Sequence, residues 1–229
     1  MSRFSLFKRT LILATGLLAL SMTASAFADL ISYDIGVPNS ALTAYPAPYA
    51  TMSIDRTSST TASVTFNALS TAAYDYLLGG QNVVDLNVNG SFNVSGVSES
   101  NSFSGFSPQP SGYPQLSSGN VSTFGTFNLS LKNFDGFQHS ATSVSFLLTN
   151  TSGTWSSAGD VLTPNGSSYM AAAHIFVCAG PCSITGGAVI TGYGANGGGS
   201  VPVPAPPIVP LAVFGLTIIG WMYRRHRMG

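Results

Sequence analysis

Residues 141–149 read ATSVSFLLT and place an apolar side chain at every second position from Val144 to Leu148. In an extended chain successive side chains point to opposite faces, so Val144, Phe146 and Leu148 share one face. The segment 62–68, ASVTFNA, shows the same alternation. Apolar residues on one side and small polar residues on the other are typical of antiparallel strands with one face on a core and one in water.

Further strands are expected along the whole middle of the chain, separated by short turn clusters of glycine, asparagine and serine. These strands are Leu30–Val37, Thr51–Arg56, Tyr74–Leu78, Ser102–Phe106, Val121–Leu131, His174–Cys178 and Ala188–Tyr193. We find neither a strict internal repeat nor a long amphipathic helical period. The sequence therefore predicts one all-β domain over residues 29–196, an antiparallel β-sandwich or jelly roll.

A β-hairpin is predicted over Val84–Val94, which reads VDLNVNGSFNV. A two-residue turn at Asn89-Gly90 would place the apolar residues of its two strands on opposite faces. A three-residue loop closed by the same glycine instead pairs Leu86 with Phe92 and gathers the apolar side chains on one face. Burial of that face favours the three-residue loop.

The first 28 residues have the pattern of a secretory signal peptide. Three basic residues near the start precede the ten-residue apolar segment Leu11–Leu20, which is short for a membrane span. The small residues Ala26 and Ala28 form a cleavage pattern, so we expect the mature chain to begin at Asp29. A retained N-terminal anchor is the alternative.

The C-terminal end has three parts, a Gly/Pro-rich linker (197–207), an apolar helix (208–223) and a basic tail (224–229). Sixteen helical residues reach about 24 Å, slightly less than the ~30 Å hydrocarbon core of a bilayer. The tail contains Arg224, Arg225 and Arg227, which would hold the C-terminus in the cytoplasm. A short span behind a proline motif suits a temporary stop in the inner membrane better than a permanent anchor.

This tail resembles the PEP-CTERM sorting signals, which exosortase enzymes recognise in Gram-negative bacteria. The family pattern is a Val-Pro-x-Pro motif, a hydrophobic helix and an arginine cluster. The matching motif consists of Val201, Pro202, Val203, Pro204 and Ala205. Val203 stands where the founding motif has Glu and is similar to the Val-Pro-Leu-Pro-Ala subclass. The resemblance implies an exosortase-type partner, a cell-surface or extracellular destination, and a connection with exopolysaccharide and biofilm.

The low content of charged residues and the negative net charge of the middle segment argue against two classes of function. Only 7% of the 229 residues are charged, against about 25% in an ordinary globular protein. Between residues 29 and 200 two basic residues, Arg56 and Lys132, stand against eight acidic ones, a net charge of −6. This composition argues against a cytosolic enzyme and against nucleic-acid binding, which requires a basic face.

Chemically active residues are scarce. Asp135, His139 and Ser140 are close in sequence, but a strand-and-turn segment with no GxSxG elbow does not establish a catalytic triad. His174 follows an apolar stretch and is expected to be a strand residue with a backbone partner. We therefore expect no catalytic residue, no resident cofactor and no metal site built on histidines. A loop calcium site that uses Asp75, Asp85 or Asp135 together with carbonyl groups remains an open alternative, although no motif marks it.

Cys178 and Cys182 are the only cysteines. Export would place them in an oxidising compartment, where such a pair usually forms a disulfide. Gly180 and Pro181 between them favour the turn that the bond needs.

Three functions remain open. The leading one is a non-enzymatic exported surface or matrix protein. A carbohydrate-binding module is the alternative, if aromatic residues align on one exposed face instead of filling the core. A secreted hydrolase is third, and would need a cleft that holds a histidine against a carboxylate. The aromatic residues considered are Tyr113, Phe124, Phe127, Phe134, Phe137, Trp155 and Tyr169.

Overall fold

The computed structural model describes residues 29–108, 115–121, 123–134 and 136–197. Eleven strands form one antiparallel sheet, and the short 3-10 helices η2 (Phe137–His139) and η3 (Ala158–Asp160) lie in its connections. The strands are β1 Asp29–Pro38, β2 Ala50–Arg56, β3 Thr61–Ala68, β4 Tyr74–Leu78, β5 Gly80–Leu86, β6 Phe92–Ser100, β7 Gln115–Val121, β8 Gly125–Phe134, β9 Ser143–Asn150, β10 Ala171–Ala179 and β11 Ile190–Asn196. The prediction of an all-β antiparallel fold is confirmed.

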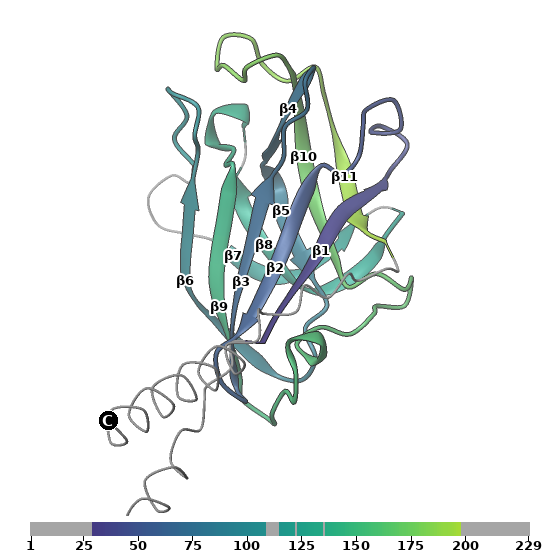
Figure 1. The fold of residues 1–229 in the computed structure, drawn as a ribbon, viewed down its shortest axis with the longest axis vertical. Helices are drawn as coiled ribbons and strands as arrows, with labels where there is room; N and C mark the ends of the chain where they lie inside the picture. The colour runs from purple at the N-terminus through teal and green to yellow at the C-terminus, as the bar shows by residue number, and fades with distance from the viewer. Residues whose placement is uncertain (1–28, 109–114, 122, 135, 198–229) are drawn as a thin grey trace, which may run out of the picture.

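The sheet folds over on itself into two layers, as in a β-sandwich. Its strand order is β6-β9-β3-β2-β1-β11-β10-β5-β8-β7, with β4 paired to β10 beyond the end of β5. Figure 1 shows β6, β9, β3, β2 and β1 in the front layer and the remaining strands behind them. The sheet is not closed, so β6 and β7 are its two free edges.

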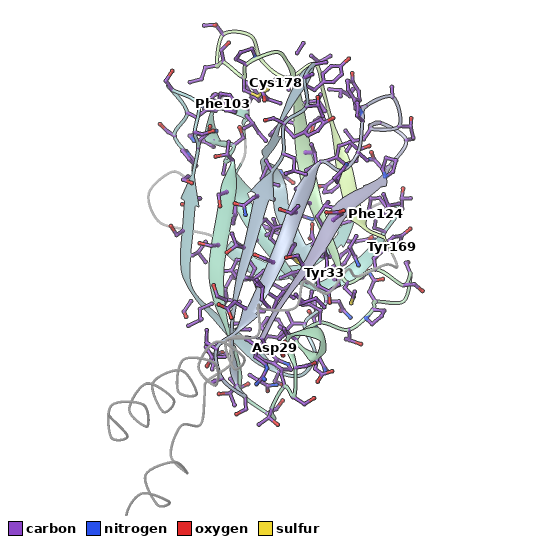
Figure 2. The ribbon with its side chains drawn as sticks, in the orientation of Figure 1. Asp29, Tyr33, Phe103, Phe124, Tyr169 and Cys178 are labelled. Atoms are coloured by element: carbon purple, nitrogen blue, oxygen red, sulfur yellow. A yellow bond between two sulfur atoms is a disulfide. The ribbon has the colours of Figure 1, made fainter. Side chains whose placement is uncertain are left out.

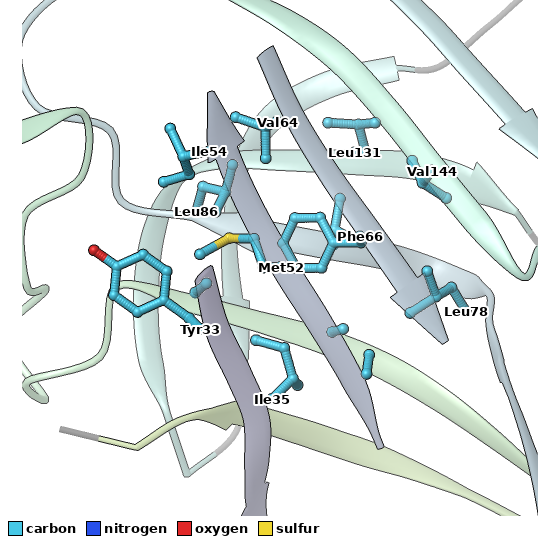
Figure 3. Close-up of a cluster of buried hydrophobic side chains, with 14 of the residues drawn as sticks. Tyr33, Ile35, Met52, Ile54, Val64, Phe66, Leu78, Leu86, Leu131 and Val144 are labelled. Atoms are coloured by element: carbon cyan, nitrogen blue, oxygen red, sulfur yellow. The ribbon is translucent and has the colours of Figure 1, made fainter. Parts of the chain in front are cut away.

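The core lies between the two layers and follows the predicted alternation. Every second side chain of β3 and of β9 is buried, among them Phe66 and Val144. Met52 of β2 lies beside them, and Leu86 and Leu131 come from the other layer (Figure 3). Burial of each such side chain contributes about 1.5–3 kcal/mol, so this shared face is the main source of the domain's stability.

The hairpin predicted over Val84–Val94 is wrong. β5 pairs with β8 and β10, whereas β6 pairs with β9 in the other layer. The Asn128 side-chain amide accepts a hydrogen bond from the Val88 N–H and donates one to the Val88 carbonyl, both at 2.8 Å. The Asn128 side chain thus satisfies both main-chain hydrogen-bonding groups of Val88, which a neighbouring strand would otherwise do. Gly90, with φ +89°, then turns the chain across to the second layer.

Two other strand predictions need correction. Ser102–Phe106 is a loop, because the Asn101 side chain accepts a hydrogen bond from the main chain two residues ahead and Gly105 has φ +87°. The strand predicted over Val121–Leu131 is divided between two strands, because Val121 ends β7 and β8 begins only at Gly125. Strand β7 itself escaped prediction because QLSSGNV is too polar to show an apolar alternation.

The pairing of β6 with β9 leads to a prediction for two neighbouring residues. Phe92 is half-buried against the core, whereas Asn93 is exposed. We expect Phe92→Ser to lower the free energy of unfolding by about 2 kcal/mol and Asn93→Ser by less than about 0.5 kcal/mol. Urea denaturation measures both values, and equal midpoint shifts would contradict the faces assigned to β6.

The two ends of the domain leave the sheet in the same direction. β1 and β11 are antiparallel neighbours, so β11 runs toward the end at which β1 starts. Asp29 begins β1 there, and its carboxylate accepts hydrogen bonds from Arg56 Nε and from the Ala158 N–H. We call this the terminal end; Cys178 and Phe103 lie at the opposite, distal end (Figure 2).

The predicted targeting segments lie outside the described residues. These are the signal peptide 1–28, the motif 201–205, the helix 208–223 and the tail 224–229. Within the described ranges, no helix is both long and apolar enough to cross a bilayer.

Candidate functional site

A shallow groove lies between the two free edges of the sheet. Its volume is about 560 Å³. Edge strand β6 supplies one wall, β7 supplies the other, and β8 supplies two further residues. The lining residues are Phe92, Asn93, Val94, Leu116, Ser117, Ser118, Asn128 and Leu129. We call this site the seam groove.

The seam groove combines apolar surface with a small number of free polar groups. Leu116 is 44% exposed, and Phe92 and Val94 are half-buried on the opposite wall. Asn93 and Ser118 are exposed, and their side chains form no hydrogen bond with any described residue. Every lining residue is uncharged. A ligand in the seam groove would contact aliphatic and aromatic side chains, the amide of Asn93 and the hydroxyl of Ser118.

Each wall has one register shift close to the seam groove. The β6–β9 register shifts between Ser95 and Ser98, with the extra residue on β6 beyond the lining residues. The β7–β8 register shifts between Ser117 and Gly119, with the extra residue on β8. Such bulges bend the strand that carries the extra residue and increase its twist.

A buried carboxyl group lies on the outer face of the layer that contains β5 and β8. Asp85 is 0% exposed, and Ser130 donates a hydrogen bond to its Oδ1. Its Oδ2 is buried and has no hydrogen-bond partner among the described residues. Burial raises the pKa of Asp85 to about 7, although the Ser130 hydrogen bond and the Lys132 charge act in the opposite direction.

Gly119 makes this arrangement possible. A Cβ at this position would overlap the Ser130 hydroxyl and press on Asp85 Oδ1, so β7 can cover the pair only with a glycine. Tyr193 is close enough for the Asp85 charge to contribute, after burial, to raising its pKa to about 12. The sequence contains no signal for this pair, because Asp85 and Ser130 are 45 residues apart and meet only through the β5–β8 register.

Neither described histidine contacts the carboxylate of another described residue. His174 lies between the Gly79 carbonyl and the Thr191 hydroxyl, each 2.7 Å from a ring nitrogen. Because a carbonyl only accepts, Nδ1 carries the proton and Nε2 accepts from Thr191, and burial lowers the pKa of His174. His139 Nδ1 is 2.8 Å from the Ser107 carbonyl. The histidine–carboxylate pair expected of a hydrolase is not found among the described residues.

The two described candidate calcium ligands, Asp75 and Asp85, lie far apart. On β10, Asp75 pairs with Cys178 and Asp85 pairs with Ala172, six residues away. At about 3.3 Å per residue the two carboxylates are roughly 20 Å apart. Asp135 lies outside the described residues, and no cluster of three histidine, cysteine, aspartate or glutamate residues occurs within them.

The predicted disulfide is formed. Cys178 and Cys182 are bonded, with their Cα atoms 5.3 Å apart, and both are buried beside Leu77 and Phe103. Gly180 between them adopts φ +75°, which a residue with a side chain rarely does. The bond therefore fixes the start of the β10–β11 loop at the distal end.

The aromatic residues fill the interior. Phe124, Phe127 and Trp155 are at most 1% exposed, and Phe137 and Tyr169 are half-buried. Across the described ranges no aromatic side chain is exposed. The expected core role is confirmed for Phe124, Phe127 and Trp155, whereas Phe137 and Tyr169 are only partly buried and pack against buried clusters. Tyr113 and the side chain of Phe134 lie outside the described part. The exposed large apolar residues are Leu116, Ile184, Val189 and Ile190.

Comparison of the chain with protein-family models, curated proteins and solved structures gives no match. Its own residues therefore carry the functional assignment. Among the described residues, the seam groove offers a surface that a ligand could contact.

Proposed function

We propose that this protein is an exported, non-enzymatic protein of the cell surface or extracellular matrix. An exosortase-type enzyme would recognise the motif Val201–Ala205 in its C-terminal sorting signal. The proposal rests on the order of segments along the chain, with an export signal first, a β domain next, and a proline motif, apolar helix and arginine cluster last.

One structural observation supports it above all. All the strands of the described sheet lie between Asp29 and Asn196, and the first and last strands are neighbours that point their free ends the same way. Loss of the segments before Asp29 and after Gly197 would therefore remove no strand and no described core residue. Processing at both ends is compatible with an intact domain.

The route follows from the chemistry of the tail. The apolar segment Ile208–Tyr223 would hold the exported chain in the inner membrane, with the arginines inside because a charge at the bilayer centre costs a few kcal/mol. Proline fixes φ and cannot sustain helix hydrogen bonds, so the motif would stay extended and accessible outside the membrane. Processing would release a tail-less acidic domain to the surface or matrix.

The tail can be tested by substitution in the native host. Replacing Arg224, Arg225 and Arg227 with Ser should leave full-length protein in the inner-membrane fraction, because the signal is incomplete. Changing Pro202 and Pro204 to Ala should do the same. A triple Arg→Lys variant is the matched control for charge, and it should still be oriented with its tail inside. Release of the Ser variant at the wild-type level would contradict the assigned signal.

A further inference from the structure

Asparagine is followed by glycine at three places in the described part of the chain, Asn89-Gly90, Asn165-Gly166 and Asn196-Gly197. Such a pair can lose ammonia without an enzyme, because glycine has no side chain to shield its main-chain nitrogen from the asparagine amide. We propose that Asn89 is a site of spontaneous deamidation in the folded protein, whereas the fold protects Asn165 and Asn196. This modification does not depend on the proposed export route.

The reaction at Asn89 needs only water. The Gly90 main-chain nitrogen bonds to the side-chain Cγ of Asn89 and passes its proton, through solvent, to the amide nitrogen, which leaves as ammonia. Water then adds to one of the two carbonyl groups of the resulting cyclic imide and breaks its C–N bond. Opening at the side-chain carbonyl gives aspartate. Opening at the main-chain carbonyl gives isoaspartate, in which the main chain runs through the former side chain.

The surroundings of Asn89 leave both reacting groups accessible. Asn89 and Gly90 are exposed in the segment that crosses between the two layers. The Asn89 side chain makes one described hydrogen bond, from Nδ2 to the Asp160 carbonyl at 3.0 Å. Within the described ranges the Gly90 N–H donates no hydrogen bond. A single hydrogen bond therefore holds the amide, and water can reach the attacking nitrogen.

The other two amides are held more firmly. Asn165 makes three hydrogen bonds, because its Oδ1 accepts two main-chain N–H groups of the turn that follows and its Nδ2 donates to the Phe124 carbonyl. Asn196 is 1% exposed, and its Oδ1 accepts two main-chain N–H groups where β10 begins, each at 2.9 Å. Several hydrogen bonds must break before either amide carbon can turn toward the next nitrogen, so the local structure slows the reaction.

Deamidation of Asn89 would weaken the contact between the crossing segment and η3. A carboxylate at this position has no hydrogen to donate to the Asp160 carbonyl. The Asn89 carbonyl also accepts the Trp155 indole N–H at 2.9 Å, and the longer main chain of isoaspartate would shift that carbonyl. The deamidated protein should therefore unfold at a lower urea concentration than the unmodified protein.

Peptide mapping by mass spectrometry tests the proposed ranking. The full-length protein in a mild detergent would be incubated at mildly alkaline pH, once folded and once in concentrated guanidinium chloride, which supplies a reference rate for each site. We expect the ratio of folded to unfolded rate to be at least about tenfold higher at Asn89 than at Asn165 or Asn196, since fewer hydrogen bonds must break. A ratio at Asn89 no higher than at the other two sites would overturn the proposal.

An Asn89→Asp variant reproduces the aspartate product and tests its consequence. Its urea midpoint should lie below that of the wild type. Asn93→Asp is the matched control, because it adds the same charge at an exposed asparagine whose side chain has no described hydrogen bond, and it should leave the midpoint nearly unchanged. Equal midpoints for the two variants would contradict the proposed loss of the contact with η3. Neither measurement needs sorting, so a negative result would leave the proposed export route intact.

Discussion

At pH 8 we expect the Asp85→Asn variant to be more stable than the wild-type protein, and at pH 4 we expect the two proteins to be similar in stability. The reason is the buried carboxyl group, whose pKa rises from 3.8 to about 7 on folding. As pH rises from about 4 to 7, the unfolded chain releases this proton while the folded chain keeps it. The wild-type protein therefore loses stability across that window, and the loss stays constant once Asp85 ionises in the folded state as well.

The expected size follows from the shift. Each pKa unit corresponds to about 1.4 kcal/mol, so the loss amounts to about 4 kcal/mol by pH 8. Asparagine has nearly the same shape and no charge, so it avoids this loss. Its amide NH2 would stand at the unpartnered Oδ2 position, where the neutral wild-type acid also leaves a buried donor without a partner. The two proteins should therefore be similar at pH 4, and the advantage of the Asn variant should grow as pH rises.

The measurement is urea denaturation of both proteins between pH 4 and pH 8. The difference between them isolates Asp85 from other titrating groups, such as Glu99 and His174. Tyr193, whose pKa is raised to about 12 by burial and by the Asp85 charge, stays neutral across this range. Ser130→Ala is the matched control, and it should keep the pH dependence because the carboxyl group remains. Parallel pH profiles for the wild type and Asp85→Asn would contradict a raised pKa.

The second large effect is expected at Trp155. Its ring is 1% exposed at the terminal end, and its indole N–H donates to the Asn89 carbonyl at 2.9 Å. Trp155→Ala should lower the free energy of unfolding by about 3–5 kcal/mol, because it opens a large cavity and frees the segment that crosses between the layers.

Trp155→Phe separates the two contributions. It keeps most of the buried ring but loses the hydrogen bond to Asn89, so we expect a loss of about 1–2 kcal/mol. Thermal or urea denaturation measures both variants. A similar loss for Phe and Ala would mean that the hydrogen bond, and not the packing of the ring, holds the crossing segment.

The local sequence pattern was sufficient to predict the strands that have one apolar face and one polar face. In β3 and β9 the apolar side chains at alternate positions are the ones that the sandwich buries, so Phe66 and Phe146 lie where the period of two predicts. The disulfide could also be predicted from the sequence. The chain has only two cysteines, four residues apart, and the Gly-Pro pair between them favours a turn.

The wrong hairpin shows where local pattern fails. Asn89-Gly90 does mark a change of direction, but the sequence cannot say that Asn128, 40 residues from Val88, will bind the strand before the turn. That long-range contact directs β5 and β6 into different layers. The polar strand β7 escaped notice for a related reason, because only its pairing with β8 makes it a strand.

Both sites depend on the same long-range pairing. The seam groove exists because β6 and β7 are the two ends of the strand order, so Asn93 and Leu116 face each other only after the whole sheet has formed. Asp85 was singled out as a calcium ligand, yet the fold buries it against Ser130. Sequence patterns identified the residue types but not their partners.

The most direct test of the central proposal is the intact mass of the protein isolated from the cell surface or medium of its native host. The proposed route predicts a chain that begins at Asp29 and lacks the segment from Ile208 to the C-terminus, with the Cys178–Cys182 disulfide retained. A protein that keeps Arg227 and remains in the inner membrane would contradict the proposal and make the tail an ordinary anchor.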